Sequence, residues 1–370
     1  MLELDTAPLR VEQRGGLGLL TLDAPKSLNA LSLETIRALD AALRRWADDP
    51  QVACVLLQSS SDKAFCAGGD VRGLREACLA DKGPEPNASA LQFFGEEYRL
   101  DHRIHTYAKP IVVWGGGIVM GGGVGLLAGA SHRVVSETSR IAMPEVGIGL
   151  FPDVGGSWFL RRMPGRVGLF LGLTGAAMNA HDALFTGLAD HFMHQASREP
   201  LIAALSALRW SADAIENHAL ADEALRPFEA DAEPLLPPSP VRTHYDTLQA
   251  LTAAPRLRDV VAAITGYDGD SAWLQRAAQS LAAGSPTSVA LVGELWQLTR
   301  HLSLADVFRL ELIVALQCCA RGDFAEGVRA LLVDKDGRPQ WSPRAFDEVT
   351  PAWIDAHFAA PWTTHPLADL

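Results

Sequence analysis

Short apolar runs alternate with amphipathic stretches along the first half of the chain. Four of these runs have the length and continuous apolar character of buried strands: residues 17–24, 52–60, 110–115 and 132–137. After Ser32, a residue type favoured at helix N-caps, the apolar residues recur instead at the spacing of one helix face. They are Leu33, Ile36, Leu39, Leu43 and Trp46. Strands that alternate with helices in this way predict an α/β core.

From about Gly165 onward the pattern is mostly helical. Long aliphatic stripes cover residues 285–296 and 304–332, and we assign them to core packing or to a subunit contact, which would allow a homo-oligomer. Proline is dense between Pro234 and Arg242, which predicts a surface connection between helical stretches.

Composition and charge narrow the class of protein. The chain has 370 residues, of which 48% are apolar and 21% charged, as is ordinary for a globular enzyme. A net charge of −12 disfavours nucleic acid and anionic membranes as partners. The first residues contain no basic segment followed by an apolar one, and the five cysteines form no CxxC pair. We therefore expect a reduced, cytoplasmic protein.

Residues 111–130 form an uncharged stretch of twenty residues, which is long enough to cross a bilayer. Eight of the twenty are glycine, and six of these glycines form two triplets that would interrupt a single helix. We therefore expect a buried strand, loop and helix in this stretch, and no membrane contact.

Two glycine-rich elbows each follow a strand-like run and open into a helix-like one: FCAGGD at 65–70 and MGGGVG at 120–125. Clustered glycine marks close backbone approach or positive φ. One interpretation is a dinucleotide-binding loop at residues 115–121, with Glu137 as the acid that binds the ribose. That interpretation leaves the first elbow unexplained.

The other interpretation of the elbows is an oxyanion site. Helix N-termini carry unpaired N–H donors and a partial positive charge, and glycine lets a substrate come within hydrogen-bond distance. Two such N–H groups from separate loops can hold a carbonyl oxygen as it gains negative charge. This interpretation uses both elbows.

Four motifs occur in order along the chain: SLNALS, KAFCAGGDVR, KPIVVWGGGIVMGGGVGL and AMPEVGIGLFPDVGGSWFLRR. Together with DKDGRPQWSP near the C-terminus, they resemble the crotonase (enoyl-CoA hydratase/isomerase) superfamily, and within it the 3-hydroxyisobutyryl-CoA hydrolase branch. The resemblance implies an α/β fold with a crotonase-type spiral of ββα turns at residues 1–195. A helical C-terminal region at residues 196–370 would complete the fold.

The resemblance also implies roles for individual residues. Gly69 and Gly122 match the family glycines whose N–H groups hold the thioester oxygen. Glu145 matches the catalytic carboxylate, and Asp153 matches a second acid that is found in the hydrolase branch. Glu97 resembles a glutamate that contacts the substrate in the hydrolases.

Two further points of the resemblance concern coenzyme A and the type of reaction. Lys26, Ser27 and Leu28 lie where the adenine and phosphates of coenzyme A pass in the family. Hydratases have a second glutamate at the position of Gly125, and the hydration of a double bond uses two carboxylates on one water. Since Gly125 has no side chain, we expect thioester cleavage rather than hydration.

Simpler interpretations exist for several of these residues. Glu145 could have a capping or surface role, and Asp153 could be a helix N-cap. Ser157 does not lie in a GxSxG elbow, so we assign it to the N-terminal end of a helix rather than to a nucleophile. The histidines lack the spacing of metal ligands, so we expect no metal site.

The sequence therefore predicts an acyl-CoA thioester hydrolase. The resemblance implies 3-hydroxyisobutyryl-CoA as the substrate and valine degradation as the pathway. Coenzyme A is part of the substrate, and we expect no separate cofactor. Two alternatives stay open: hydration or isomerisation of an enoyl-CoA on the same fold, and an acyl-CoA-binding protein without catalytic activity.

Overall fold

The computed structural model describes residues 8–81 and 86–370, which fall into two compact units. The first unit contains the described residues up to Gly69, together with Leu100–Ile141 and Met178–Ser239. The second unit contains the described residues of Asp70–Arg99, together with Ala142–Ala177 and Pro240–Leu370. The division of the sequence at residue 195 into a spiral core and a helical region stays a prediction.

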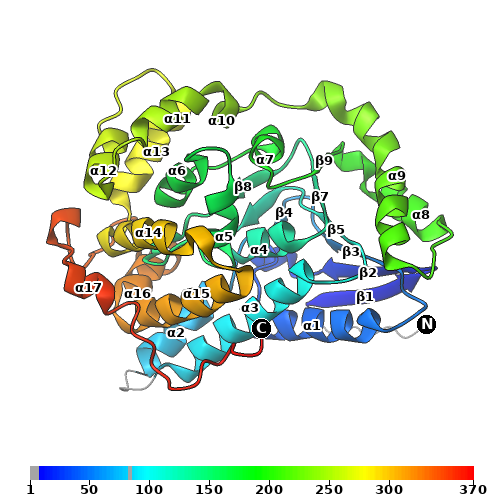
Figure 1. Cartoon of the computed structure of the whole chain (residues 1–370), viewed down its shortest axis with the longest axis horizontal. Coiled ribbons are helices and arrows are strands. Elements are labelled where there is room, and N and C mark those ends of the chain that lie inside the picture. Colours follow the sequence, from blue (N-terminus) through cyan, green and yellow to red (C-terminus); the bar gives the residue numbers. More distant parts are fainter. Residues whose placement is uncertain (1–7, 82–85) are drawn as a thin grey trace. The chain divides into compact units, whose positions relative to one another are not determined.

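A six-stranded sheet belongs to the first unit (Figure 1). Its strands, in spatial order, are β1 (Leu9–Arg14), β2 (Leu17–Leu22), β3 (Cys54–Ser59), β5 (Ile111–Trp114), β7 (His132–Val135) and β9 (His191–Phe192). Strands β1 and β2 pair antiparallel, and the other neighbours pair parallel. The four predicted strands correspond to β2, β3, β5 and β7, so these predictions are confirmed.

A second, three-stranded sheet alternates with the large sheet along the chain. Its strands are β4 (Ala64–Cys66), β6 (Ile118–Met120) and β8 (Arg140–Ala142). Each of β3, β5 and β7 is followed by one strand of the small sheet and then by helix. Because parallel neighbours need a crossover connection, this order produces repeated ββα turns. The predicted α/β class and the ββα spiral are therefore confirmed.

The helices of the first unit include α1 (Leu33–Ala47), α4 (Gly122–Gly129), α7 (Ala180–Thr186), α8 (Arg198–Ala207) and α9 (Ala214–Ala232). Helix α3 (Ala88–His105) belongs to the second unit up to Arg99 and to the first unit from Leu100. The second unit also includes α2 (Val71–Ala80), α5 (Gly156–Phe159), α6 (Val167–Thr174), α10 (Pro240–Thr243), α11 (Tyr245–Leu251), α12 (Leu257–Thr265), α13 (Ala272–Ala283), α14 (Pro286–Leu298), α15 (Leu304–Ala320), α16 (Asp323–Val328) and α17 (Pro351–Asp355).

The second half of the chain is mostly helical, as predicted, with one exception. Strand β9 has only two residues, and it joins the large sheet beside β7. So short a strand has no sequence period that could reveal it. The proline-rich segment from Pro234 to Arg242 connects α9 to α11, as predicted, although Ser239 and Val241 within it are buried.

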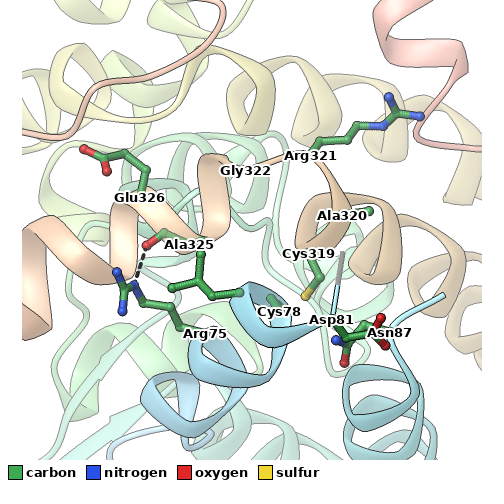
Figure 2. Close-up of a pocket in the computed structure, with 11 residues that line it drawn as sticks. Arg75, Cys78, Asp81, Asn87, Cys319, Ala320, Arg321, Gly322, Ala325 and Glu326 are labelled. Carbon is green, nitrogen blue, oxygen red and sulfur yellow. Dashed lines mark hydrogen bonds between the residues drawn. The ribbon is translucent and has the colours of Figure 1, made fainter. Parts of the chain in front are cut away.

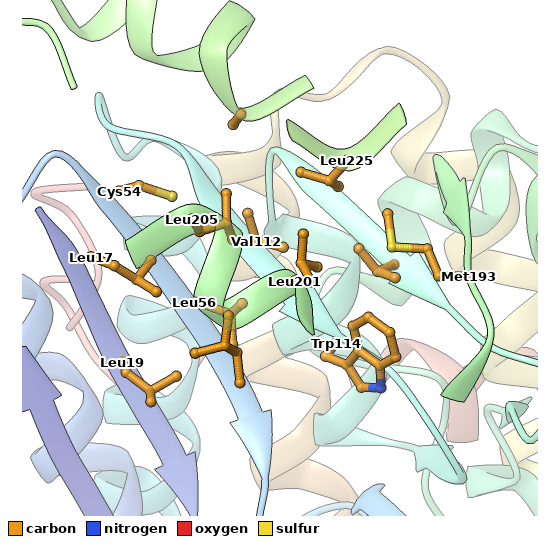
Figure 3. Close-up of a cluster of buried hydrophobic side chains, with 13 residues drawn as sticks. Leu17, Leu19, Cys54, Leu56, Val112, Trp114, Met193, Leu201, Leu205 and Leu225 are labelled. Atoms are coloured by element: carbon orange, nitrogen blue, oxygen red, sulfur yellow. The ribbon is translucent and has the colours of Figure 1, made fainter. Parts of the chain in front are cut away.

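The hydrophobic core of the first unit joins the large sheet to helices α8 and α9 (Figure 3). Side chains alternate along a strand, so every second residue of β2, β3 and β5 faces this core. The strand residues include Leu17, Leu19, Cys54, Leu56, Val112 and Trp114, and the helix residues include Leu201, Ile202, Leu205, Ala221 and Leu225. Burying one large aliphatic side chain contributes about 1.5–3 kcal/mol. The core therefore fixes β3 and β5, which lead into the two glycine elbows.

Helix α1 begins where the sequence predicts. The Ser32 hydroxyl accepts a hydrogen bond of 3.1 Å from the Thr35 N–H, as an N-cap does. The predicted apolar face is buried at Ile36, Leu39, Leu43 and Trp46, whereas Leu33 at the start of the helix is half-buried. The amphipathic pattern therefore identified both the helix and its packed face.

Residues 111–130 contain strand β5, strand β6 and helix α4, so the predicted strand and helix are confirmed, and the predicted loop contains the additional strand β6. Within the described part of the chain, no helix is long and apolar enough to cross a membrane. The glycines at 115–117 lead into strand β6 rather than into a helix, which is not the geometry of a dinucleotide loop. The carboxylate of Glu137 instead accepts the Gln195 N–H at 2.9 Å.

Candidate active site

The two glycine elbows pack against each other in the first unit. Gly68 has φ of +109° and Gly121 has φ of +50°, conformations that favour glycine. A Cβ placed on Gly68 would lie 3.3 Å from the Met120 carbonyl oxygen, and one placed on Gly123 would lie 2.4 Å from the Cys66 carbonyl oxygen. The glycines are therefore required by the close approach of two backbones, as the sequence predicts.

Gly69 and Gly122 both occupy positions from which a backbone N–H can bind a ligand. Gly122 is the first residue of α4, where an N–H has no partner inside the helix. Gly69 forms a parallel bridge with Leu31, in which the Leu31 N–H donates to the Gly68 carbonyl at 2.8 Å. Among the hydrogen bonds of residues 8–81 and 86–370, none uses the N–H of Gly69 or Gly122. An oxyanion site formed by these two groups stays a prediction.

The segment expected to meet coenzyme A lies beside the first elbow. Lys26 and Ser27 are exposed in a short 3₁₀ helix, Pro25–Ser27. Leu28 follows in the left-handed conformation, with φ of +54°, and its carbonyl accepts the Ala67 N–H at 3.0 Å. These contacts fix the segment to the elbow, and its role in binding coenzyme A stays a prediction.

Asn29 is a supporting residue that the sequence analysis did not single out. Its side chain is buried, and its amide nitrogen donates to the Ser59 hydroxyl at 2.7 Å and to the Phe65 carbonyl at 3.0 Å. Its amide oxygen accepts the Ala24 N–H at 2.8 Å. Asparagine tolerates the left-handed conformation found here, with φ of +55°. Its position inside the SLNALS turn is the signal that could have identified it.

Three predicted site residues come together in the second unit. Glu97 lies on α3, Glu145 begins a 3₁₀ helix, Glu145–Ile148, and Asp153 lies in the turn before α5. Their exposed fractions are only 2%, 5% and 4%. Such burial rules out a surface role for Glu145. Asp153 is not a helix N-cap either, because Gly155 occupies that position of α5.

Burial and mutual repulsion raise the pKa values of these acids. Burial, followed by the charge of Asp153, holds the pKa of Glu97 and that of Glu145 well above their usual range. Burial also raises the pKa of Asp153 to about 6, partly offset by a hydrogen bond from Tyr98. Buried carboxyls with shifted pKa values are suited to proton transfer near neutral pH.

Two carboxyl oxygens of this cluster have no hydrogen-bond partner within the described residues. They are Oε1 of Glu97 and Oε2 of Glu145, and both are buried. Buried polar atoms in proteins are nearly always satisfied, so such atoms point to a bound ligand or water. The acid cluster therefore has the character of a binding site and not of a packed core.

The structure adds two residues to the acid cluster that the sequence analysis did not identify. The Tyr98 hydroxyl donates a hydrogen bond of 2.7 Å to Oδ2 of Asp153. The Glu311 carboxylate accepts the N–H groups of Gly155 at 2.8 Å and Ser157 at 2.9 Å. A charged residue within the aliphatic stripe at 304–332 is the signal for Glu311. Ser157 lies at the start of α5, as predicted for a helix N-terminal serine.

A separate cavity of about 480 Å³ lies in the second unit (Figure 2). Its lining includes Arg75 and Cys78 of α2, and Cys319 and Arg321 at the end of α15. The thiols of Cys78 and Cys319 form a hydrogen bond. None of the predicted site residues lines this cavity. Within residues 8–81 and 86–370, no group of three or more His, Cys, Asp or Glu side chains could hold a metal ion.

Comparisons with known proteins agree with this fold and identify the family of the chain. The sequence matches the model of the enoyl-CoA hydratase/isomerase family over residues 17–358. Among curated relatives, the mitochondrial 3-hydroxyisobutyryl-CoA hydrolase of Danio rerio is 38% identical, over 94% of this chain and 88% of the relative. The mitochondrial 3-hydroxyisobutyryl-CoA hydrolase of Homo sapiens is 36% identical, over 94% of this chain and 87% of the relative.

Two solved structures resemble the whole chain. A carnitinyl-CoA dehydratase from Mycobacterium thermoresistibile has a TM-score of 0.84 and 35% identity, over 96% of this chain and 97% of its own. An enoyl-CoA hydratase from Rhodobacter sphaeroides 2.4.1 has a TM-score of 0.82 and 35% identity, over 96% of this chain and 98% of its own. The chain belongs to the enoyl-CoA hydratase/isomerase, or crotonase, family, whose members act on acyl-CoA substrates.

Proposed function

We propose that this protein hydrolyses the thioester bond of 3-hydroxyisobutyryl-CoA, giving 3-hydroxyisobutyrate and coenzyme A, a reaction of valine degradation. The observation that carries the proposal is the pairing of Glu145 with Asp153 in one buried acid cluster, while Gly125 in α4 has no side chain. The names of the curated relatives support the same substrate.

In the proposed mechanism, the N–H groups of Gly69 and Gly122 bind the thioester oxygen as it becomes negative. Two such donors stabilise the tetrahedral intermediate more than the ground state, and losing one typically costs about 10²- to 10³-fold in rate. The carbonyl carbon gains an oxygen, the C–S bond breaks, and the sulfur leaves as the thiol of coenzyme A.

Glu145 supplies the base or the nucleophile in this mechanism. As a base it would take a proton from water while that water attacks the carbonyl carbon. As a nucleophile it would form an anhydride that water then cleaves. Either role needs the ionised carboxyl, and its raised pKa makes it a stronger base than an exposed glutamate.

Asp153 and Glu97 would bind the polar end of the acyl group and the attacking water. Oε1 of Glu97 is buried and has no partner among residues 8–81 and 86–370, so it can accept a hydrogen bond from the substrate hydroxyl. Burial raises the pKa of Asp153 to about 6, so this carboxyl is ionised above that pH. It would orient the water or the substrate hydroxyl.

Hydration of an enoyl-CoA is the second candidate function, because the similar solved structures are named as a dehydratase and a hydratase. Gly125 argues against it, since one of the two carboxylates that hydration uses is absent at that position. A non-catalytic acyl-CoA-binding protein is the third candidate. The presence of both Glu145 and Asp153 in a buried cluster argues against that candidate.

The deciding experiment compares two reactions of the purified protein. Thiol release is followed with a thiol reagent for 3-hydroxyisobutyryl-CoA and for a panel of other short acyl-CoAs. Hydration of crotonyl-CoA is followed by loss of the enoyl absorbance. We expect rapid thiol release from 3-hydroxyisobutyryl-CoA and little hydration. Efficient hydration with negligible thiol release would restore the hydratase interpretation. A protein that catalyses neither reaction would instead support the interpretation as an acyl-CoA-binding protein.

A further inference from the structure

The turn that carries Asp153 has an unfavourable backbone conformation. Val154 has φ of +51° and Gly155 has φ of +82°, so two successive residues are left-handed. For glycine this conformation is easy, but for a β-branched residue such as valine it is rare, because Cβ crowds the following backbone. Such a conformation persists only where the surrounding structure holds it in place.

Glu311 holds this turn by accepting hydrogen bonds from the backbone of the turn. Each oxygen of its carboxylate accepts one N–H, Oε2 from Gly155 and Oε1 from Ser157. The side chain has no exposed surface. A buried carboxyl group whose two oxygens accept backbone N–H groups two residues apart restrains the chain directly after Asp153. The restraint therefore acts on the position of the Asp153 Cα atom.

Tyr98 holds the same turn through the side chain of Asp153. Its hydroxyl donates to Oδ2 of Asp153 at 2.7 Å, and its ring has no exposed surface. The ring packs at 5.5 Å from the ring of Phe308, which lies one turn before Glu311 on α15, and at 5.9 Å from the ring of Phe94. The packing fixes the hydroxyl, and the hydroxyl fixes the orientation of the carboxyl group.

We propose that Tyr98 and Glu311 are positioning residues that together hold the Asp153 carboxyl in its productive orientation. This inference rests on the proposed function, in which Asp153 orients water or the substrate hydroxyl. Tyr98 also stabilises the ionised form of Asp153, because a donor hydrogen bond is stronger to a carboxylate than to a carboxylic acid.

The charge of Asp153 raises the pKa values of several titratable groups that surround it. Glu97 and Tyr98 approach from α3, Glu145 from the 3₁₀ helix that it begins, and Glu311, Cys318 and Cys319 from α15. The tyrosine hydroxyl is the group that donates to the Asp153 side chain. The hydrogen bond from Tyr98 lowers the pKa of Asp153, so removing the hydroxyl should raise that pKa further.

Tyr98→Phe tests the side-chain contact, since it removes the hydroxyl and keeps the ring. We expect kcat for thiol release from 3-hydroxyisobutyryl-CoA to fall about 10- to 100-fold, the usual cost of losing a hydrogen bond to a charged group, with little change in KM. The acidic limb of the pH–rate profile should move to higher pH. The matched control is Tyr107→Phe, which removes a hydroxyl hydrogen bond of the same 2.7 Å, made to the Leu43 carbonyl, and should change neither quantity.

A double variant shows whether Tyr98 acts through Asp153. In an Asp153→Asn background, Tyr98→Phe should cause little further loss of kcat, because the carboxylate that it positions is absent. An equal loss in both backgrounds, or an unmoved pH profile in the single variant, would overturn the inference. Full activity of Asp153→Asn alone would overturn the role of Asp153 in the proposed function, and the inference with it.

Glu311→Gln tests the backbone contact. Glutamine keeps one oxygen but presents an NH₂ group where the other oxygen accepts an N–H, so half of the restraint is lost. We expect kcat to fall together with Tm. The matched control is Asp182→Asn, because the Asp182 carboxylate is also fully buried and accepts the Asn179 N–H at 3.0 Å in the first unit. The control should lower Tm and leave kcat unchanged. A Glu311→Gln protein that behaves in the same way as this control would overturn the role of Glu311.

Discussion

Glu145 and Asp153 share one buried cluster, in which burial and then the negative charge of Asp153 raise the pKa of Glu145. Neither carboxyl forms an ion pair with Lys, Arg or His within the described residues. Burying these carboxyls without a positive partner therefore lowers the stability of the fold, because isolated buried charges are strongly disfavoured. A role in binding a ligand explains why such a cluster is kept.

Replacing Glu145 with glutamine should nearly abolish turnover. The change keeps the shape of the side chain and removes both its basicity and its nucleophilicity. We expect kcat for thiol release to fall by at least ~10³-fold, with a smaller change in KM, toward the upper end of general-base effects. The matched control is Glu137→Gln, whose carboxylate accepts the backbone N–H of Gln195 and lies 3.7 Å from the His194 ring. If Glu145→Gln kept more than about a tenth of wild-type turnover, the mechanism would be wrong.

Adding a side chain at Gly122 should block the thioester oxygen. We expect Gly122→Val to reduce kcat/KM by about 10²- to 10³-fold, as the loss of one oxyanion donor does. The control is Gly95→Val on α3, where an added Cβ meets no atom within 4 Å. Tm is measured for both variants. A loss of activity at Gly122 that merely parallels the loss of Tm would mean that the glycine serves only the turn.

The stability of the protein should depend on the ionisation of Glu311. Burial, followed by the charge of Asp153, raises the pKa of Glu311 from 4.5 to about 8, against two backbone N–H groups that lower it. The folded state thus binds this proton more tightly than the unfolded chain does. The stabilisation is fully present below pH 4.5 and is lost as pH rises through about 8.

Unfolding of the wild type and of Glu311→Gln measured between pH 5 and 8 tests this dependence. We expect the free energy of unfolding of the wild type to decrease with pH more steeply than that of the variant, by a total on the order of a few kcal/mol. Parallel pH dependences would show that Glu311 titrates near its ordinary value.

The thiol of Cys78 should be more reactive because of Cys319. The hydrogen bond from Cys319 lowers the pKa of Cys78 below its usual value, although burial and the charge of Asp81 oppose it. Replacing Cys319 with alanine should therefore raise the pKa of Cys78 and slow its alkylation by iodoacetamide near pH 8. Mass spectrometry of Cys78 over a pH series measures this, with buried Cys54 as the internal control. An unchanged alkylation profile would contradict the prediction.

The sequence by itself determined the elements whose signals are local. The four apolar runs, the Ser32 cap and the packed face of α1 each depend on residues within a few positions of one another. The two glycine elbows could be predicted for the same reason, because the need for glycine at a close backbone approach is visible in the motif. The ordered motifs then supplied Glu145 and Asp153 as candidates, and a separate, shorter match, FFGEEYRL, supplied Glu97.

Only the tertiary structure decided which side chains meet. Tyr98 and Asp153 are separated by 55 residues, and Glu311 lies 156 residues beyond the Gly155 N–H that it binds. The two-residue strand β9 likewise depends on its partner β7. No local period or cap encodes such contacts. They form because folding buries polar groups that must find partners, and chain topology alone decides which partners are within reach.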